Sequence, residues 1–147
     1  MTAVKICGIM QPEHAAAAAE AQADFIGLVF AESRRGVTVE QARGILHHLR
    51  EDRQDPPQAV GVFADMPAQE VNRIAREVGL DRVQLSGLEP REYRRLIDLP
   101  VIRAVKLPPG CSPEEAREAL TEIYEALDPM ADLCLVEPYV EGSYGGT

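Results

Sequence analysis

Val4-Lys5-Ile6-Cys7-Gly8-Ile9 is the segment on which the interpretation of this chain depends. A short apolar run ends in a cysteine and is followed directly by a glycine. This pattern predicts a buried strand that delivers a thiol to the start of a loop. Such a thiol is either a small buried hydrophobic group or a reactive group at the mouth of a site, and the rest of the chain favours the reactive group.

Apolar runs of four to six residues alternate along the chain with longer amphipathic stretches. The runs predict strands and the stretches predict helices, several of which begin with proline or, at Thr38 and Gln41, with a capping-box pair. The strands recur every ~20–30 residues, the spacing of βα units with parallel strands. The predicted strands are 4–7, 25–30, 59–63, 82–85, 101–106 and 133–137, and the predicted helices are 12–23, 38–49, 67–78, 90–97 and 113–127.

Two architectures accept this alternation: a doubly wound open sheet and part of an eight-stranded barrel. Side chains two residues apart in a strand point to the same face, so Lys5 shares a face with Cys7, and Gln84 shares a face with Ser86. Strands buried on both faces of an open sheet rarely carry so many polar residues, and no glycine-rich nucleotide-binding motif follows a strand. We therefore expect an α/β fold of the (β/α)8 TIM-barrel type, with about six βα units in one partial barrel domain spanning 1–147.

Composition excludes several kinds of partner. A net charge of −9 and a pI of about 4.8 disfavour nucleic acid and anionic membranes. No apolar run approaches the ~20 residues of a membrane span, and the N-terminus lacks a signal-peptide pattern. Three widely spaced cysteines indicate free thiols in a reducing cytoplasm rather than a disulfide framework or a zinc site.

Reactive groups of a (β/α) barrel lie where strands end and βα loops begin. At those positions the chain carries a thiol and a carboxyl group that can serve as base and acid in a proton transfer. Simpler roles compete, because a buried cysteine is usually a core residue, a strand-end glutamate can cap a helix, and paired loop arginines are often solvated. The candidates are Cys7, Ser33-Arg34-Arg35, Gln84, Ser86, Lys106 and Glu137.

Taken together, five segments resemble the phosphoribosylanthranilate isomerase family of tryptophan biosynthesis. Val4-Lys5-Ile6-Cys7-Gly8-Ile9 is similar to its opening strand, and the resemblance extends in order and spacing over essentially the whole chain. The other segments are Ala23-Asp24-Phe25-Ile26-Gly27-Leu28-Val29-Phe30 with Ser33-Arg34-Arg35, Val60-Gly61-Val62-Phe63, Val83-Gln84-Leu85-Ser86-Gly87, and Leu135-Val136-Glu137-Pro138-Tyr139 with Gly145-Gly146-Thr147.

The resemblance implies an isomerase that converts N-(5-phosphoribosyl)anthranilate to 1-(2-carboxyphenylamino)-1-deoxyribulose 5-phosphate by an Amadori rearrangement, without metal or cofactor. It implies Cys7 as the base, Glu137 as the acid and Arg35 as the group that holds the anthranilate carboxylate. Gln84, Ser86, Gly145 and Gly146 are the further substrate-binding residues that it implies. A phosphorylated small molecule is the expected partner, and a homodimer is left open.

The chain departs from the family in three places. The family usually has aspartate where this chain has Glu137 (or Glu141, if the alignment shifts locally) and histidine where it has Ser86. It also continues through two more strands, whose loops hold the substrate phosphate. We therefore expect 1–147 to be a C-terminally truncated piece, unstable and inactive alone. The alternatives are a non-catalytic binding or assembly remnant of the same barrel and another phosphosugar-handling barrel enzyme.

Overall fold

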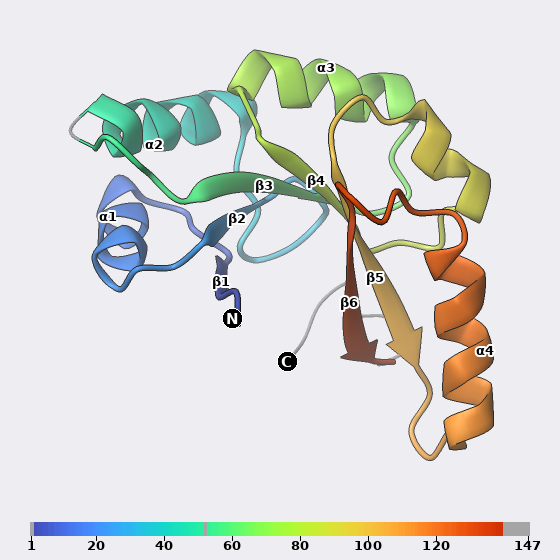
Figure 1. Cartoon of the computed structure of the whole chain (residues 1–147). Helices are drawn as coiled ribbons and strands as arrows, with labels where there is room; N and C mark the ends of the chain where they lie inside the picture. Colours follow the sequence, from blue (N-terminus) through green and yellow to red (C-terminus); the bar gives the residue numbers. More distant parts are fainter. Residues whose placement is uncertain (1, 52, 140–147) are drawn as a thin grey trace.

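The computed structural model describes residues 2–51 and 53–139. These residues form one parallel sheet in the order β1-β2-β3-β4-β5-β6, so every strand lies beside the next strand in the sequence. Figure 1 shows the sheet strongly curled, as expected for consecutive strands of a barrel. The strands are β1 (Lys5–Cys7), β2 (Phe25–Val29), β3 (Gln58–Phe63), β4 (Arg82–Leu85), β5 (Val101–Leu107) and β6 (Leu133–Pro138).

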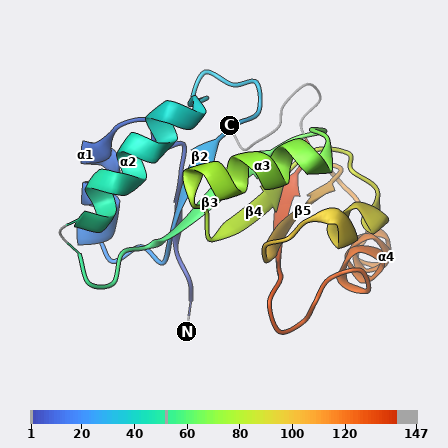
Figure 2. The ribbon, with the colours of Figure 1, turned by 90° about the horizontal axis from the view of Figure 1, so that it is seen from above.

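The connections between strands run along the outer, convex side of the sheet (Figures 1 and 2). α1 packs against α2 and α2 against α3, while α4 lies along β5. This arrangement is the (β/α) alternation expected from the sequence, and it confirms the barrel-type α/β fold. The helical elements are α1 (Pro12–Glu20), α2 (Val39–Glu51), α3 (Ala68–Val78), the 3-10 helix η1 (Arg91–Leu96) and α4 (Pro113–Tyr124).

The core lies between the sheet and the helices. Ile26, Leu28 and Phe63 on the convex face of the sheet are fully buried against apolar helix residues such as Leu46 and Ile74. Because successive side chains of a strand alternate between faces, the neighbours of these residues point to the concave side. The described helices all lie on the convex side and leave the concave face to the strands, and that face is where a barrel would carry its site.

β1 and β6 form the two edges of the sheet, as expected for six strands of this type. Apolar side chains of both edge strands are exposed, with Val136 at 52%, Leu133 at 41%, Ile6 at 37% and Leu135 at 36%. In the four inner strands the corresponding residues are almost entirely buried. The apolar surface therefore meets solvent at the edges.

One aspartate at the start of every second strand ties the strands together in pairs. Asp24 accepts the N–H of Val4 at 2.7 Å, and Asp81 accepts the N–H of Ala59 at 2.7 Å. Asp132 does the same for the N–H of Val101, again at 2.7 Å. Each carboxylate satisfies a backbone donor that would otherwise be unpaired where a strand begins. The end of the sheet at which the strands begin is thus built from a repeated two-strand unit.

The sequence placed most elements correctly, with small differences at helix ends. Thr38 and Gln41 form the expected reciprocal cap, in which each side chain accepts the other residue's N–H, at 2.9 and 3.1 Å. The segment 90–97, predicted as a helix, is instead the short 3-10 helix η1. Among the residues described, no helix is long and apolar enough to cross a membrane.

Candidate functional site

The candidate acid and base lie on the same face of the sheet. Cys7 is opposite Gly27 of β2, and from there the register continues through Val60 on β3 to Arg82 on β4. Side chains two residues apart in a strand share a face, so Gln84 lies on the same face as Arg82. Gln84 pairs with Ile102 of β5, which shares its face with Lys106, and Lys106 pairs with Glu137 of β6. Both the candidate thiol and the candidate carboxyl group therefore belong to the concave side.

Cys7 is exposed at the end of β1, so its sulfur is not a core group. It lies over Gly27, where an added Cβ would be 2.6 Å from the Cys7 Sγ and 3.1 Å from the Lys5 Nζ. Glycine at position 27 thus leaves the space that the sulfur and the ammonium group share. This proximity of Lys5 to the sulfur follows from period two along β1.

Arg35 reaches the same corner from the loop after β2. An added Cβ at Gly8 would be 2.7 Å from the Arg35 Cδ and 3.1 Å from both its Nε and Nη1. Gly8 has a φ of 83°, and the N–H groups of Gly8 and Ile9 both donate to the carbonyl of Gly27 at 3.0 Å. This left-handed turn lets the guanidinium lie against the backbone directly after Cys7. The structure thereby brings Arg35 close to the candidate base.

Gln84 and Ser86 are brought together, but away from solvent. The Gln84 Nε2 donates to the Ser86 Oγ at 2.9 Å, and Ser86 is fully buried. The Gln84 Oε1 is buried without a hydrogen-bond partner among the residues described. An unpaired buried acceptor costs about 1–3 kcal/mol. It is therefore the expected position for a donor supplied by a ligand or by water.

A buried network that the sequence analysis missed holds the loop after Ser86. Asp65 donates its N–H to the Glu89 Oε1 at 2.9 Å and accepts the N–H of Leu88 at 2.7 Å. Glu89 also pairs with Arg103 of β5 at 2.5 Å, with side chains only 2% and 11% exposed. An added Cβ at Gly87 would be 2.5 Å from the Asp65 Oδ1, so the loop requires glycine there. The only sequence signal was a glutamate two residues after Gly87.

Tyr93 extends this network into η1. Its hydroxyl donates to the carbonyl of Met66 at 2.5 Å. Burial raises the pKa of Tyr93, and the negative charges of Glu89 and Asp65 raise it further. The hydroxyl therefore stays protonated and acts as a donor that joins the loops after β3 and β4.

Glu137 is partly exposed near the end of β6. Its register partner in β5 is Lys106, so an ammonium and a carboxyl group are neighbours at this edge of the sheet. Lys106 also lines a hollow of about 420 Å³ beside the loop from β5 to α4. A small-molecule ligand typically occupies a space of this order.

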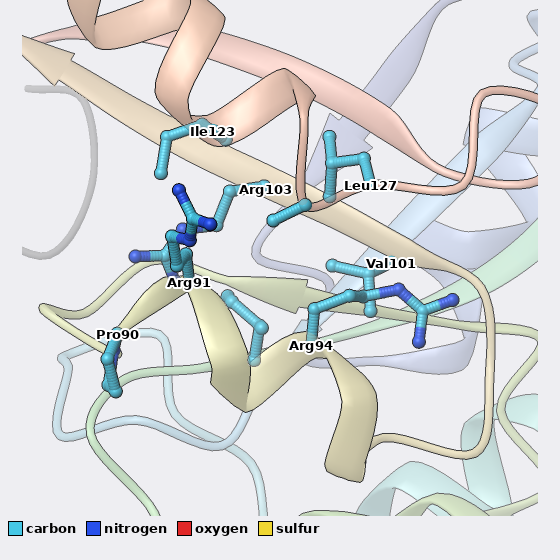
Figure 3. Close-up of a pocket in the computed structure, with 9 residues that line it drawn as sticks. Pro90, Arg91, Arg94, Val101, Arg103, Ile123 and Leu127 are labelled. Atoms are coloured by element: carbon cyan, nitrogen blue, oxygen red, sulfur yellow. The ribbon is translucent and has the colours of Figure 1, made fainter.

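A second, much smaller cavity lies on the convex side and is not part of this site. It has a volume of about 10 Å³ and lies between η1, β5 and α4, with Arg94, Arg103 and Ile123 among its lining residues (Figure 3). The Nε of Arg103 is buried without a partner among the residues described. This volume is of the size of a single water molecule.

Within 2–51 and 53–139, no three His, Cys, Asp or Glu side chains gather in a way that could hold a metal ion. Gly145 and Gly146, predicted to bind substrate, and Glu141, the alternative acid, lie outside the described residues. The described site therefore consists of Cys7, Lys5, Arg35, Glu137 and the buried Gln84–Ser86 pair.

Known proteins resemble this chain over almost its whole length. The family model described as N-(5'phosphoribosyl)anthranilate (PRA) isomerase matches residues 4–146. The N-(5'-phosphoribosyl)anthranilate isomerase of Dehalococcoides mccartyi is 40% identical over 147 residues, which are 100% of this chain and 66% of that protein. For three curated relatives the share of their length that the chain spans lies between 59% and 66%.

Solved structures show the same architecture. The crystal structure of phosphoribosyl anthranilate isomerase from Thermotoga maritima has a TM-score of 0.81 and 31% identity, over 100% of this chain and 66% of that one. A crystal structure of phosphoribosyl anthranilate isomerase in complex with reduced 1-(o-carboxyphenylamino)-1-deoxyribulose 5-phosphate has a TM-score of 0.67 and 27% identity. That match covers 99% of this chain and 91% of the other.

Proposed function

Because the chain belongs to the N-(5'-phosphoribosyl)anthranilate isomerase family, we propose that the protein to which it contributes isomerises N-(5'-phosphoribosyl)anthranilate. The product is the corresponding 1-(o-carboxyphenylamino)-1-deoxyribulose 5-phosphate, the compound whose reduced form is bound in a related crystal structure. The reaction is internal to the substrate, so its atoms and electrons balance without a second reactant. Its two key proton transfers are to the ribose ring oxygen and from C2.

We assign the two transfers to Glu137 and Cys7. Protonation of the ribose ring oxygen by Glu137 breaks the C1–O bond and leaves an iminium ion at C1. Cys7 then removes the proton from C2, and the electron pair of that C–H bond forms the C1–C2 double bond of an enolamine. The π electrons of the iminium return to the nitrogen in this step. Protonation at C1 and loss of the proton of the C2 hydroxyl group then give the ketone. An acid and a base on one face of a cavity are the geometry this sequence needs.

The observation that carries the proposal is the position of Cys7 on the concave face, at a strand end and open to solvent. A buried structural cysteine would lie under packed aliphatic side chains instead. Glu137 belongs to the same face, at the same end of the sheet. In a (β/α) barrel, this end is where catalytic residues are found.

We further assign Arg35 to the anthranilate carboxylate. Its guanidinium lies beside the loop that follows Cys7, and it makes no ion pair with any carboxylate of the residues described. A planar guanidinium suits a carboxylate because it can donate two parallel hydrogen bonds. Gln84 fits a binding role through its unpaired Oε1, and Ser86 orients Gln84. For Gly145 and Gly146, the substrate-binding role stays a prediction.

One observation favours a second candidate, a non-catalytic remnant that binds without turnover. Ser86 occupies the position where the family usually has histidine, and it is fully buried. A hydroxyl cannot carry the positive charge that imidazole acquires near neutral pH. If the reaction needs that charge, the site still binds the substrate but does not convert it.

A chimeric protein tests the two candidates. Residues 1–147 replace the matching two thirds of the Dehalococcoides mccartyi isomerase, and consumption of N-(5'-phosphoribosyl)anthranilate is followed by chromatography. We expect turnover, a loss of about 10²–10⁴-fold in Cys7→Ala, and unchanged affinity of that variant for the reduced product. Binding of the reduced product without turnover in the unmutated chimera would instead support the remnant. Near-normal turnover in Cys7→Ala would refute the assignment of the base.

Two further expectations stay predictions. A location in the cytoplasm is tested by fractionating cells that produce the protein. A homodimer is tested by light scattering on the purified chain, which gives the mass of the species in solution.

A further inference from the structure

Lys5 brings positive charge to the sulfur of Cys7, and Arg35 lies against the backbone of Gly8, in a chain whose net charge is −9. Within 2–51 and 53–139, neither side chain pairs with a carboxylate, whereas Arg73, Arg94 and Arg103 all do. The sequence alone gives Lys5 no part in the chemistry, yet in the structure its ammonium group lies beside the sulfur.

The hollow over Gly27 determines how close the two groups come. The Sγ of Cys7 and the Nζ of Lys5 both lie within 3.1 Å of the point where a Cβ of residue 27 would be. The two atoms are therefore less than about 6 Å apart, a separation at which opposite charges interact appreciably. Lys5 is also partly buried, which reduces the screening of its charge by water.

We propose that Lys5 is a positioning residue whose ammonium group stabilises a negative charge at Cys7. Gly27, which has no side chain, leaves the space in which the ammonium group and the sulfur lie close together. The ammonium stabilises an anion at this point, whether it is the thiolate or an acidic group of a bound molecule. The consequence for catalysis rests on the proposed function. The charge environment itself does not, and it can be measured without substrate.

Alkylation by a matched pair of reagents measures this environment. Iodoacetamide is neutral and iodoacetate is anionic, and both react by the same displacement, in which the thiolate sulfur forms a C–S bond and iodide leaves. The ratio of their rate constants at one cysteine cancels the fraction of thiolate and reports the surrounding charge. Peptide mass spectrometry of the chimera gives this ratio separately for Cys7 and for Cys111, the internal reference.

We expect the iodoacetate-to-iodoacetamide ratio at Cys7 to exceed that at Cys111 by about threefold, the effect of one positive charge at this separation. Lys5→Met should lower the ratio at Cys7 by about threefold, while Lys5→Arg should preserve it. Arg34→Gln, which removes a positive charge from the exposed loop beside Arg35, is the matched control and should change little. Circular dichroism checks that each variant is folded.

An equal ratio at Cys7 in the unmutated chain and in Lys5→Met would overturn the proposal. So would a decrease in Arg34→Gln as large as the decrease in Lys5→Met. If Lys5→Met does not fold, the salt dependence of the unmutated chain decides. Raising NaCl from about 20 mM to about 500 mM should lower the ratio at Cys7, because salt screens an attraction. A ratio that stays constant or rises would contradict the role of Lys5.

Kinetics of the chimera separate this inference from the proposed function. A chimera without turnover, together with an alkylation ratio that depends on Lys5, would refute the isomerase and leave the charge role of Lys5 intact. An active chimera whose alkylation ratio does not change in Lys5→Met would support the isomerase and refute the charge role of Lys5.

Discussion

Cys7 and Glu137 lie on one face of the sheet although they belong to its two edge strands. Five parallel registers connect them, and in each register the paired side chains point to the same side. A shift of one residue in any register would have put the thiol and the carboxyl group on opposite faces. The curl of the sheet then makes this common face the inner one (Figure 1).

The carboxyl group of Glu137 should be needed for turnover but not for binding. In the chimera, Glu137→Gln should lower kcat by about 10²–10⁴-fold, because the amide cannot donate the acid's proton. Glu137→Asp should raise kcat, because the extra methylene of glutamate moves the proton donor away from the position that the family's aspartate gives it. A displacement of ~1 Å can lower the rate by ~100-fold. Steady-state kinetics measure both effects. Glu118→Gln on the exposed side of α4 is the control, and an unchanged kcat in Glu137→Gln would remove the acid from the scheme.

Adding one methyl group should have opposite effects at two glycines. A Cβ at Gly27 would collide with the Cys7 sulfur, whereas a Cβ at Gly44 in α2 would meet no heavy atom within 4 Å. Gly27→Ala should therefore destabilise the fold by about 1–3 kcal/mol. Gly44→Ala should stabilise it by about 0.5–1 kcal/mol, because alanine favours the helix. Urea unfolding of both variants measures the difference, and equal effects would show that the hollow over Gly27 is not tightly filled.

Hydrophobic pattern alone was enough to predict the strands. β4 begins and ends where the sequence placed it, and the other five strands differ by a single residue at one end. Parallel strands with helices on one side have long apolar runs, and these runs carry a strong signal. The common face of Cys7 and Glu137 followed from the same alternation.

Helix ends and loop contacts could not be predicted in this way. α1 was expected to continue to Ala23, yet it ends at Glu20 and is followed by Gln22 with a φ of 57°. Alanine favours a helix at every position of this stretch, so its propensity cannot show where the chain must turn into β2. The approach of Arg35 to Gly8 likewise depends on the path of a loop, which no periodicity describes.

Removing one member of the buried pair Glu89–Arg103 should cost far more than removing both. Arg103→Met alone leaves the Glu89 carboxylate buried and should destabilise the fold by about 3–5 kcal/mol. The double variant Glu89→Leu/Arg103→Met should recover most of that loss, because no buried charge is left unpaired. Urea unfolding of four proteins, the unmutated chain, Glu89→Leu, Arg103→Met and the double variant, measures the coupling. The exposed pair Arg73–Glu70 is the control, since Arg73→Gln should change stability little. Additive effects of the two buried substitutions would show that water reaches the pair.

Asp132 should make stability depend on pH at the acidic end. Burial by itself would raise the pKa of this carboxyl group. The hydrogen bonds from Arg94 and from the N–H groups of Val101 and Asp128 outweigh burial and lower it. A lowered pKa in the folded state means that the stabilisation is present above the unfolded value of about 3.9 and is lost as the pH falls through the folded value.

Asp132→Asn removes that titration, because the amide carries no charge and cannot accept all of these hydrogen bonds. We expect the variant to be less stable than the unmutated chain by about 1–3 kcal/mol at pH 7, the range for hydrogen bonds to a charged group. The difference should shrink as the pH falls from about 4, where the unfolded chain takes up the proton, through the lower pKa of this carboxyl group in the folded state. Urea unfolding at several pH values measures the difference, with Asp98→Asn on the exposed surface as the control. A difference that is the same at pH 7 and at pH 3 would mean that the shape of the side chain, and not its charge, holds the start of β5 in place.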